Sequence, residues 1–361
     1  MRARCALPSV RQRVFTAAVS PVRARLIRRV SKKWVNGTVL RYYFFDRDGD
    51  GEEVRLSDGR TEWCSYVGDE DQREVVRQAF QAWKEVGIGL DFREVEARED
   101  AEVRIGFMPG DGAWSYVGRD ILDQAPSADE RTMNFGWDLT ARGEFDTALH
   151  EIGHALGFPH EHQNPHSGIV WDEEAVFQTM AKPPNEWNRE DTHYNIIRKL
   201  DAGEAEGSSW DPDSIMHYPF EAGLIKEPAR FARGLTPRPG LSERDKALVR
   251  SFYPEPVAED YATLEPLKTA ILDIGPGEQK NFWIEPPASR RYTIQTFGES
   301  DTLLVLFEED QGELRYCCAD DDSGEDHNAQ LKYKLIKGRR YLIRVRLYYS
   351  AGAQQTAVMV W

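Results

Sequence analysis

The chain has 361 residues and a formal net charge of −15, with 40% hydrophobic and 30% charged residues. This composition is typical of a globular protein, and the length predicts two domains that each bury a core. The sequence holds no continuous apolar run of the roughly 18 residues that a transmembrane helix needs. Because residues 46–361 carry 35 basic against 61 acidic residues, nucleic acid is not expected as a partner.

The first 33 residues are predicted to be a basic leader or pro-segment. Residues 1–45 hold eleven Lys and Arg residues and no acidic residue. The apolar stretch Val14–Val19 is short and is followed by Pro21, so it makes no convincing signal peptide. We interpret the leader as flexible, self-docking or removable rather than as a nucleic-acid arm. Secretion is still the expected localisation, although the export route is open.

The next segments predict alternating strands and helices. Residues 38–44 are rich in β-branched and aromatic residues and predict a buried strand. Apolar residues recur at helical spacing from Asp71 to Val86, with Asp71 and Glu74 as a cap-like pair at its start. Further strands are expected at Leu90–Val95 and Val103–Phe107.

The acidic string Asp46–Gly51 begins like the calcium-binding loop of an EF-hand. Position twelve of that loop is Ser57 instead of the bidentate glutamate that an EF-hand needs. A charged hairpin turn after the first strand is therefore the favoured interpretation.

The segment His150–Glu161 has the pattern H-E-x-x-H-x-x-G-x-x-H. On a helix, His150 and His154 project from one face, so both imidazoles can bind one zinc ion. Glu151 lies beside them, where a carboxylate can act as the general base for a metal-activated water. Gly157 can take the positive φ that ends the helix, and the chain then presents His160 as a third ligand. Three protein ligands leave a position open for water, as in catalytic zinc sites.

Between His166 and Asp213 the composition turns to Pro, Asn, Asp and Trp. We expect irregular structure there that lines the site, with short helices near Asp172–Met180 and Glu190–Leu200. The segment Ser214–Tyr218 follows, with the pattern S-x-M-H-Y.

The histidine pattern and the S-x-M-H-Y segment together resemble the metzincin zinc endopeptidases, and the second segment is similar to their astacin-like branch. The resemblance implies that Met216 packs beneath the zinc histidines. It also implies that Tyr218 approaches the metal, as a fifth ligand or as a hydrogen-bond donor to the oxyanion. The remaining histidines are expected on the surface or in local hydrogen bonds, and they are His162, His166, His193, His217 and His327.

The resemblance extends over residues 34–253, which form the expected protease domain. Trp34–Phe44 is similar to the opening strand of metzincins, and Leu241–Pro254 to the closing helix. Ala113–Gly118 resembles the edge strand along which a substrate lies, which implies substrate contacts for Trp114, Ser115 and Tyr116. The domain departs from animal astacins because Cys64 is its one cysteine, so it is closer to a bacterial or fungal branch.

Two features of the leader follow from such resemblances. In astacins the glutamate after the third histidine meets the amino terminus released by activation, which implies that role for Glu161 and cleavage near residues 24–33. The string Arg4–Pro8 resembles the cysteine switch of matrix metalloproteinases, in which a thiolate caps the zinc. Only Arg, Cys and Pro match and few residues precede them, so this is the less favoured interpretation of Cys5.

Residues 254–267 form a polar, proline-bearing linker, and residues 268–361 contain short strands that predict an antiparallel β-sandwich. Lys337-Gly338 is expected to join the last two strands of four as a hairpin; these are Tyr292–Phe297, Leu303–Phe307, Leu331–Ile336 and Tyr341–Leu347. The segment resembles the pre-peptidase C-terminal domain of bacterial secreted proteases. That likeness implies a ligand on a matrix or surface.

Two interpretations of the acidic loop in that domain stay open. Calcium binding by Asp320, Asp321 and Asp322 is one, because hard oxygen ligands cluster there. A solvated acidic turn between strands is the other.

The sequence therefore predicts an α+β metzincin domain followed by an all-β sandwich, with the function of a zinc-dependent endopeptidase acting on proteins or peptides. A thermolysin-like enzyme is disfavoured, because His160 replaces the distant glutamate that such enzymes use as third ligand. A second alternative is a non-catalytic protein- or polysaccharide-binding protein with a vestigial zinc site. The intact Glu151 weighs against that reading.

Overall fold

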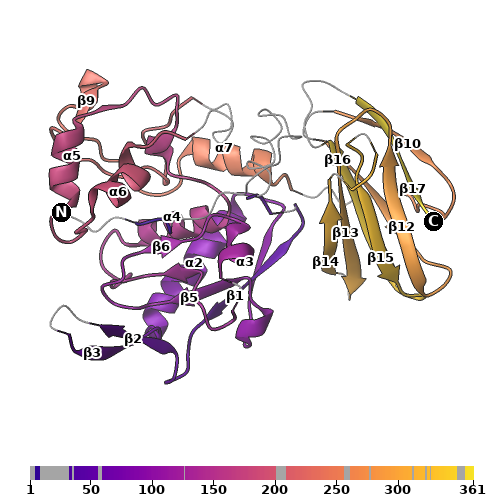
Figure 1. The fold of residues 1–361 in the computed structure, drawn as a ribbon, viewed down its shortest axis with the longest axis horizontal. Helices are drawn as coiled ribbons and strands as arrows, with labels where there is room; N and C mark the ends of the chain where they lie inside the picture. The colour runs from indigo at the N-terminus through magenta and orange to yellow at the C-terminus, as the bar shows by residue number, and fades with distance from the viewer. Residues whose placement is uncertain are drawn as a thin grey trace. The chain divides into compact units, whose positions relative to one another are not determined.

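The computed structural model describes most of the chain, in ranges separated by short gaps: residues 5–8, 32–34, 36–55, 59–125, 127–200, 209–255, 261–275, 278–310, 313–321, 323–325, 327–347 and 354–361. The chain divides into two compact units. One comprises Met1–Trp34 with Leu40–Pro254, and the other Val35–Val39 with Glu255–Trp361. Figure 1 draws the chain from indigo to yellow. No helix in the described ranges is long and apolar enough to span a bilayer.

The first unit is built on a five-stranded sheet of order β4-β1-β5-β7-β6. Strand β5 pairs in parallel with both β1 and β7, whereas β6 runs antiparallel to β7 and closes one edge. The strands are β1 (Val39–Phe44), β4 (Asp91–Glu94), β5 (Val103–Gly106), β6 (Trp114–Ser115) and β7 (Met133–Asn134). The expected strands at 38–44, 90–95 and 103–107 are confirmed.

Two long helices pack on each other beside this sheet (Figure 1). Helix α2 (Glu70–Glu85) buries Phe80 and Trp83, and the Trp83 indole donates to the carbonyl of Leu149 at 3.0 Å. That carbonyl belongs to α4 (Phe145–Ala155), which carries the histidine motif and is buried along most of its length. The predicted cap of α2 is wrong, because Asp69 is the N-cap and makes no side-chain cap bond.

The third long helix, α7 (Glu243–Phe252), closes the unit and begins with a capping box between Ser242 and Asp245. Shorter helices fill the region after the motif, near the two predicted positions. The remaining elements of this unit are β2 (Gly51–Arg55), β3 (Thr61–Ser65), α3 (Asp120–Gln124), β8 (Val170–Trp171), α5 (Glu173–Met180), α6 (Arg189–Thr192), the π-helix His193–Ile197, β9 (Ile225–Glu227), and the 3-10 turns Arg98–Asp100, Glu161–Gln163 and Ala229–Phe231.

The acidic string after β1 is a turn but not a hairpin, because β2 pairs with β3 and not with β1. Its last aspartate, Asp50, is buried and accepts the backbone N–H groups of Asp46 and Arg47. The same carboxylate forms an ion pair with the buried Arg98 at 2.7 Å. This carboxylate therefore stabilises the turn.

The second unit consists of two four-stranded antiparallel sheets, of order β10-β17-β12-β15 and β11-β16-β13-β14 (Figure 1). One buried cluster joins both sheets, with Ile294 and Val360 from the first and Leu306 and Ile343 from the second. The predicted β-sandwich is confirmed as a fold. The strands are β10 (Ala270–Ile274), β11 (Gln279–Ile284), β12 (Arg290–Phe297), β13 (Thr302–Asp310), β14 (Glu313–Asp320), β15 (Gln330–Leu335), β16 (Arg340–Leu347) and β17 (Gln354–Val360).

The predicted hairpin of the last two of those four strands is wrong. Strand β15 pairs with β12, while β16 pairs with β11 and β13, so the turn at Lys337-Gly338 crosses from one sheet to the other. A tight turn between two alternating segments fits both arrangements, and only the packing of the two sheets decides between them.

In the acidic loop of this unit, the carboxylate of Asp320 accepts hydrogen bonds from within the protein. Asp320 accepts from the backbone and hydroxyl of Ser323 and from the backbone N–H of Gln330. These bonds favour the reading as a turn between strands. Asp322 lies outside the described residues, and calcium binding by Asp320, Asp321 and Asp322 stays a prediction.

Gly153 gives a test of how tightly α4 packs on the methionine segment. A Cβ at this position would lie 2.4 Å from the sulfur of Met216 and 3.3 Å from the Trp83 ring. We expect Gly153→Ala to lower the free energy of unfolding by about 1–3 kcal/mol, because overpacking outweighs the helix propensity that alanine adds. Chemical denaturation of the metal-free chains measures it. In a Met216→Ala background the same substitution should be neutral or stabilising, and an equal loss in both backgrounds would contradict the contact.

Candidate metal centre

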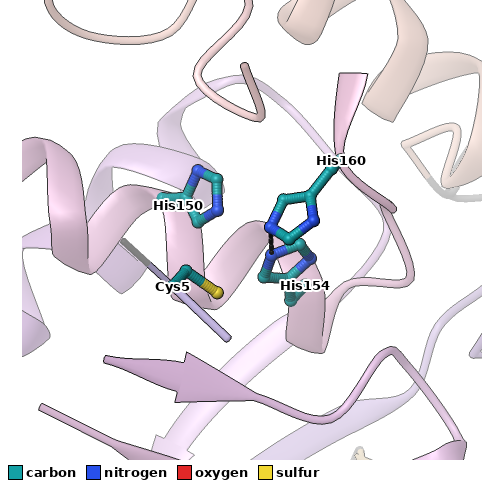
Figure 2. Close-up of side chains that lie close together, drawn as sticks. All are labelled: Cys5, His150, His154 and His160. Carbon is teal, nitrogen blue, oxygen red and sulfur yellow. Dashed lines mark hydrogen bonds between the residues drawn. The ribbon is translucent and has the colours of Figure 1, made fainter. Parts of the chain in front are cut away.

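Three imidazoles and one thiol meet at one point in the first unit (Figure 2). His150 and His154 project from α4, His160 comes from the chain beyond it, and Cys5 comes from the leader. Their ligand atoms all lie within 4.8 Å of one another, and all four residues are buried. Across the residues that the structure describes, this is the one group of three or more His, Cys, Asp or Glu side chains with metal-binding spacing.

Two backbone carbonyls orient the rings of the helix histidines. The Nδ1 atom of His150 lies 2.7 Å from the carbonyl oxygen of Ile215, and that of His154 lies 2.7 Å from the carbonyl oxygen of Phe158. Since a carbonyl only accepts, each Nδ1 carries the proton and each Nε2 offers a lone pair to the cluster. This is the arrangement that metal-binding histidines commonly show.

The inward nitrogens fit a metal ion. The Nε2 atom of His150 is buried without a hydrogen-bond partner among the described residues. The Nε2 atoms of His154 and His160 lie 3.1 Å apart, near the spacing of about 3.3 Å that follows for two nitrogens on tetrahedral zinc. A buried polar atom without a partner is costly, and a cation in the cluster would satisfy it.

The turn that brings His160 back depends on Gly157. Its φ is +100°, in the left-handed region where a side chain would be strained. Its N–H bonds to the carbonyl of His154, which ends the helix, and the same carbonyl accepts the N–H of Gly118 beside the edge strand. The turn therefore links the metal cluster to that edge.

The methionine segment lies against α4 and is held by α7. The sulfur of Met216 would meet a Cβ on Gly153, so it lies directly on the helix that carries the first two histidines. Asp245 of α7 accepts from the hydroxyl of Ser214 at 2.6 Å and from the N–H of Ile215 at 2.8 Å. One buried carboxylate thus fixes the segment whose carbonyl orients His150.

Burial sets the charge state of the site in the metal-free chain. It lowers the pKa of His150 to about 4, so this ring is neutral at pH 7 and can bind a cation. Burial likewise lowers the pKa values of His154 and His160. It raises the pKa of Glu151 to about 8, since a buried carboxylate lacks solvation.

Cys5 lies among the expected zinc ligands, which supports the less favoured interpretation of the leader. Its thiol lies 3.5 Å from a carboxylate oxygen of Glu151, and its carbonyl accepts from the hydroxyl of Tyr218. The sequence signal for Cys5 is weak because few residues match the motif, and Arg4 lies outside the described residues. The leader therefore reaches the metal cluster, the expected general base and the expected oxyanion donor at once.

The Tyr218 ring lies beside the cluster, and its centroid is 4.3 Å from that of His160 and 5.7 Å from that of His150. Its hydroxyl is taken by the leader, so its role as a metal ligand stays a prediction. The expected edge strand is present as β6, which contains Trp114 and Ser115 and continues into Tyr116, and the substrate contacts of these residues stay a prediction. The leader pairs beside it, because the N–H of Ala6 donates to the carbonyl of Ala113 at 3.3 Å.

Two buried polar residues behind the cluster were not expected. His162 is fully buried, and its Nε2 lies 2.8 Å from the carbonyl oxygen of Asn195. Asn195 in turn accepts the N–H of Leu7 on its side-chain oxygen at 3.1 Å. These partners are 33 and 188 residues apart in sequence, so no local pattern marks them.

The predicted cleavage region of residues 24–33 lies mostly outside the described residues. Lys32 is described, and its side chain pairs with Asp120 at 3.0 Å. Glu161 accepts from the backbone of Asp211 and the side chain of Asn164. Its contact with a released amino terminus stays a prediction.

A family model described as Astacin, a family of peptidases, matches residues 62–226. Bone morphogenetic protein 1 of Xenopus laevis is 30% identical to this chain over 194 residues, which are 50% of this chain and 24% of that protein. Zinc metalloproteinase nas-8 of Caenorhabditis elegans is 29% identical over 150 residues, or 41% of this chain and 31% of that protein. The chain thus spans less than a third of the length of these curated relatives.

A solved structure of myroilysin is similar over a larger share. It is 31% identical, covers 63% of this chain and 98% of its own, and superposes with a TM-score of 0.52. The likeness therefore spans nearly all of that protein.

The carboxyl group of Glu161 makes stability depend on pH. Burial raises its pKa from 4.5 to about 7, so the folded chain keeps a proton there that the unfolded chain has released. The stability contributed by this group therefore falls as pH rises from about 4.5 to about 7. We expect Glu161→Gln, which keeps the acceptor oxygen, to gain stability relative to the parent chain across that window. Urea unfolding at several pH values measures the difference, and a constant difference would contradict the shift.

Proposed function

The chain belongs to the astacin family of metallopeptidases, and from that premise we propose that it is a zinc-dependent endopeptidase that hydrolyses peptide bonds in proteins. The observation that carries the proposal is the convergence of three buried imidazole nitrogens beside the buried carboxyl of Glu151. In this proposal His150, His154 and His160 hold one zinc ion. The substrate is a protein or peptide chain.

When bound to these nitrogens, zinc supplies Lewis acidity, which brings the pKa of a water molecule to near 7 and polarises a carbonyl. Glu151 would take a proton from the attacking water as the oxygen of that water bonds to the scissile carbonyl carbon. As the C–N bond breaks, Glu151 delivers the proton to the leaving amine. Tyr218 donates a hydrogen bond to the oxygen that gains negative charge. Once the leader has left, the edge of β6 that does not pair with β7 aligns the substrate as an added strand.

Replacing the base tests the assignment of roles. We expect Glu151→Ala to keep its zinc and to lose hydrolysis by a factor of about 10²–10⁴, because general base catalysis contributes that much. Metal analysis measures the bound zinc, and cleavage of quenched peptides measures hydrolysis. Both use chains that also carry Cys5→Ala, so that the leader's thiol does not block the site. His160→Ala serves as the contrast, since it should lose the zinc itself. Undiminished turnover by Glu151→Ala would rule out the mechanism.

We further propose that the intact chain is latent because the Cys5 thiolate would be the fourth ligand of a metal ion held by the three histidines. Its sulfur lies within the same 4.8 Å cluster as the three histidines, and it is buried. Burial and the neighbouring Glu151 raise the pKa of the Cys5 thiol in the metal-free chain, whereas a bound cation favours the thiolate that ligates metals. The leader thereby excludes both water and substrate.

Removal of the thiol tests latency. We expect Cys5→Ala to bind zinc as the parent does and to cleave peptides at least about tenfold faster, because a coordinating thiolate must otherwise leave first. Cys64→Ala is the matched control, since Cys64 is a free, partly buried cysteine in β3 and far from this cluster in the sequence. Equal rates for the parent chain and Cys5→Ala would contradict latency through this residue.

The setting of the enzyme is proposed on the sequence alone. The resemblance of residues 268–361 to a domain of bacterial secreted proteases supports secretion. It also supports a ligand for that unit on insoluble protein or polysaccharide. Both remain proposals for the whole protein.

A further inference from the structure

The leader shows where a peptide main chain can bind in this site. Residues 5–8 form a short irregular segment. Three successive residues each have one main-chain group with a partner in the rest of the first unit. The carbonyl of Cys5 accepts from Tyr218, the N–H of Ala6 donates to the carbonyl of Ala113, and the N–H of Leu7 donates to the side chain of Asn195. None of these bonds depends on the leader's own side chains. A substrate offers the same main-chain groups.

The third partner is a side chain placed by a fixed local structure. Asn195 lies on the π-helix His193–Ile197 and is buried. Its side-chain nitrogen donates to the carbonyl of Asp191 at 3.1 Å, which turns the amide oxygen toward Leu7. π-Helical segments of this kind are frequent at functional sites.

The main chain around Asn195 is tied to the segment that follows the third histidine. The carbonyl of Asn195 accepts from His162, and the carbonyl of the preceding Tyr194 accepts from Gln163 at 2.7 Å. The N–H of Leu200 returns to the carbonyl of Gln163 at 2.9 Å. The acceptor oxygen is therefore held before any peptide binds, which lowers the entropic cost of binding.

An apolar surface lies behind this acceptor. Leu7 is partly buried and packs against a cluster on the segment between the histidine motif and the closing helix. Its members include Trp171, Ile196 and Phe220. A hydrogen-bond acceptor for the main chain beside an apolar wall is the usual composition of a peptide subsite.

Resting on the proposed endopeptidase function, we propose that Asn195 is a substrate-positioning residue. Its side-chain oxygen accepts a main-chain N–H of the bound peptide, two residues along the chain from the residue whose carbonyl meets Tyr218. The adjoining cluster makes this the subsite for an apolar residue. The substrates are therefore extended peptides with an apolar side chain at that place.

A peptide whose amides are replaced one at a time by esters tests the proposal, because each ester removes a single N–H donor. The enzyme is the full chain with Cys5→Ala, and the peptide carries leucine at every second position. Competition from the leader's main chain lowers the rates for the amide and ester peptides alike and cancels in their ratio. In that chain the ester at the Asn195 subsite should lower kcat/KM about five- to tenfold, the value of one net hydrogen bond. With Asn195→Ala added, the penalty at that one position should vanish while the penalties at other positions persist.

Each ratio compares two peptides on one enzyme, so a general loss of activity in the variant cancels. Gln178→Ala removes an exposed amide of the same segment and should keep the full pattern. Asn195→Asp keeps an acceptor oxygen and should keep the penalty at the Asn195 subsite. This variant is the second test if the alanine variant does not fold. Replacing the leucine at the sensitive position by asparagine should lower kcat/KM further, by at least about tenfold.

Binding separates this inference from the catalytic proposal. Fluorescence anisotropy of the same labelled amide and ester peptides is measured on the Cys5→Ala, Glu151→Gln chain with and without Asn195→Ala. It gives the coupling between the ester position and Asn195 without turnover. Coupling at one ester position supports the role of Asn195 even if the Cys5→Ala chain hydrolyses nothing, an outcome that would refute the endopeptidase. Ester penalties that are the same with and without Asn195, or peptides that do not bind, would overturn the inference.

Discussion

The hydrogen bond from the His150 ring to the carbonyl of Ile215 is the contact on which the metal centre depends. It joins helix α4 to the methionine segment, and it fixes which ring nitrogen faces the cluster. The Ile215 backbone is itself held by Asp245, whose carboxylate also caps α7. The metal site therefore draws on three elements that lie far apart in the sequence. A shift of α7 would therefore be transmitted to the His150 ring through the carbonyl of Ile215.

The sequence predicts the histidines and the base because their chemistry is local. A helix places His150 and His154 on one face by its period alone, and Gly157 supplies the turn to His160. The two-sheet fold of the second unit follows from its short alternating strands. What failed was pairing: the turn at Lys337-Gly338 suggests a hairpin, yet it joins strands of different sheets. Strand pairing is decided by distant partners, which a local pattern does not contain.

The same limit applies to the leader and to Asn195. The contact of Cys5 with Glu151 spans 146 residues, and that of Leu7 with Asn195 spans 188. No sequence motif marks either contact, because the leader binds largely through main-chain groups that every residue has. The buried His162 is a further case, since a lone histidine is usually read as a surface residue. The hydrogen bonds of such buried polar groups join residues that are far apart in the sequence, so the folded structure is needed to identify them.

Burial ties the proposed base to the occupancy of the metal cluster. With a pKa of about 8 and no cation nearby, the Glu151 carboxyl is mostly protonated at neutral pH and cannot accept a proton. A positive charge among the three imidazoles favours the carboxylate, so Glu151 becomes a base only in the chain that holds metal. The thiol of Cys5 occupies the space beside the same carboxyl in the leader-bound form. In the proposed mechanism hydrolysis therefore requires two separate events, the entry of a cation and the departure of the leader. Without the cation Glu151 keeps its proton, and without the departure of the leader the attacking water is excluded.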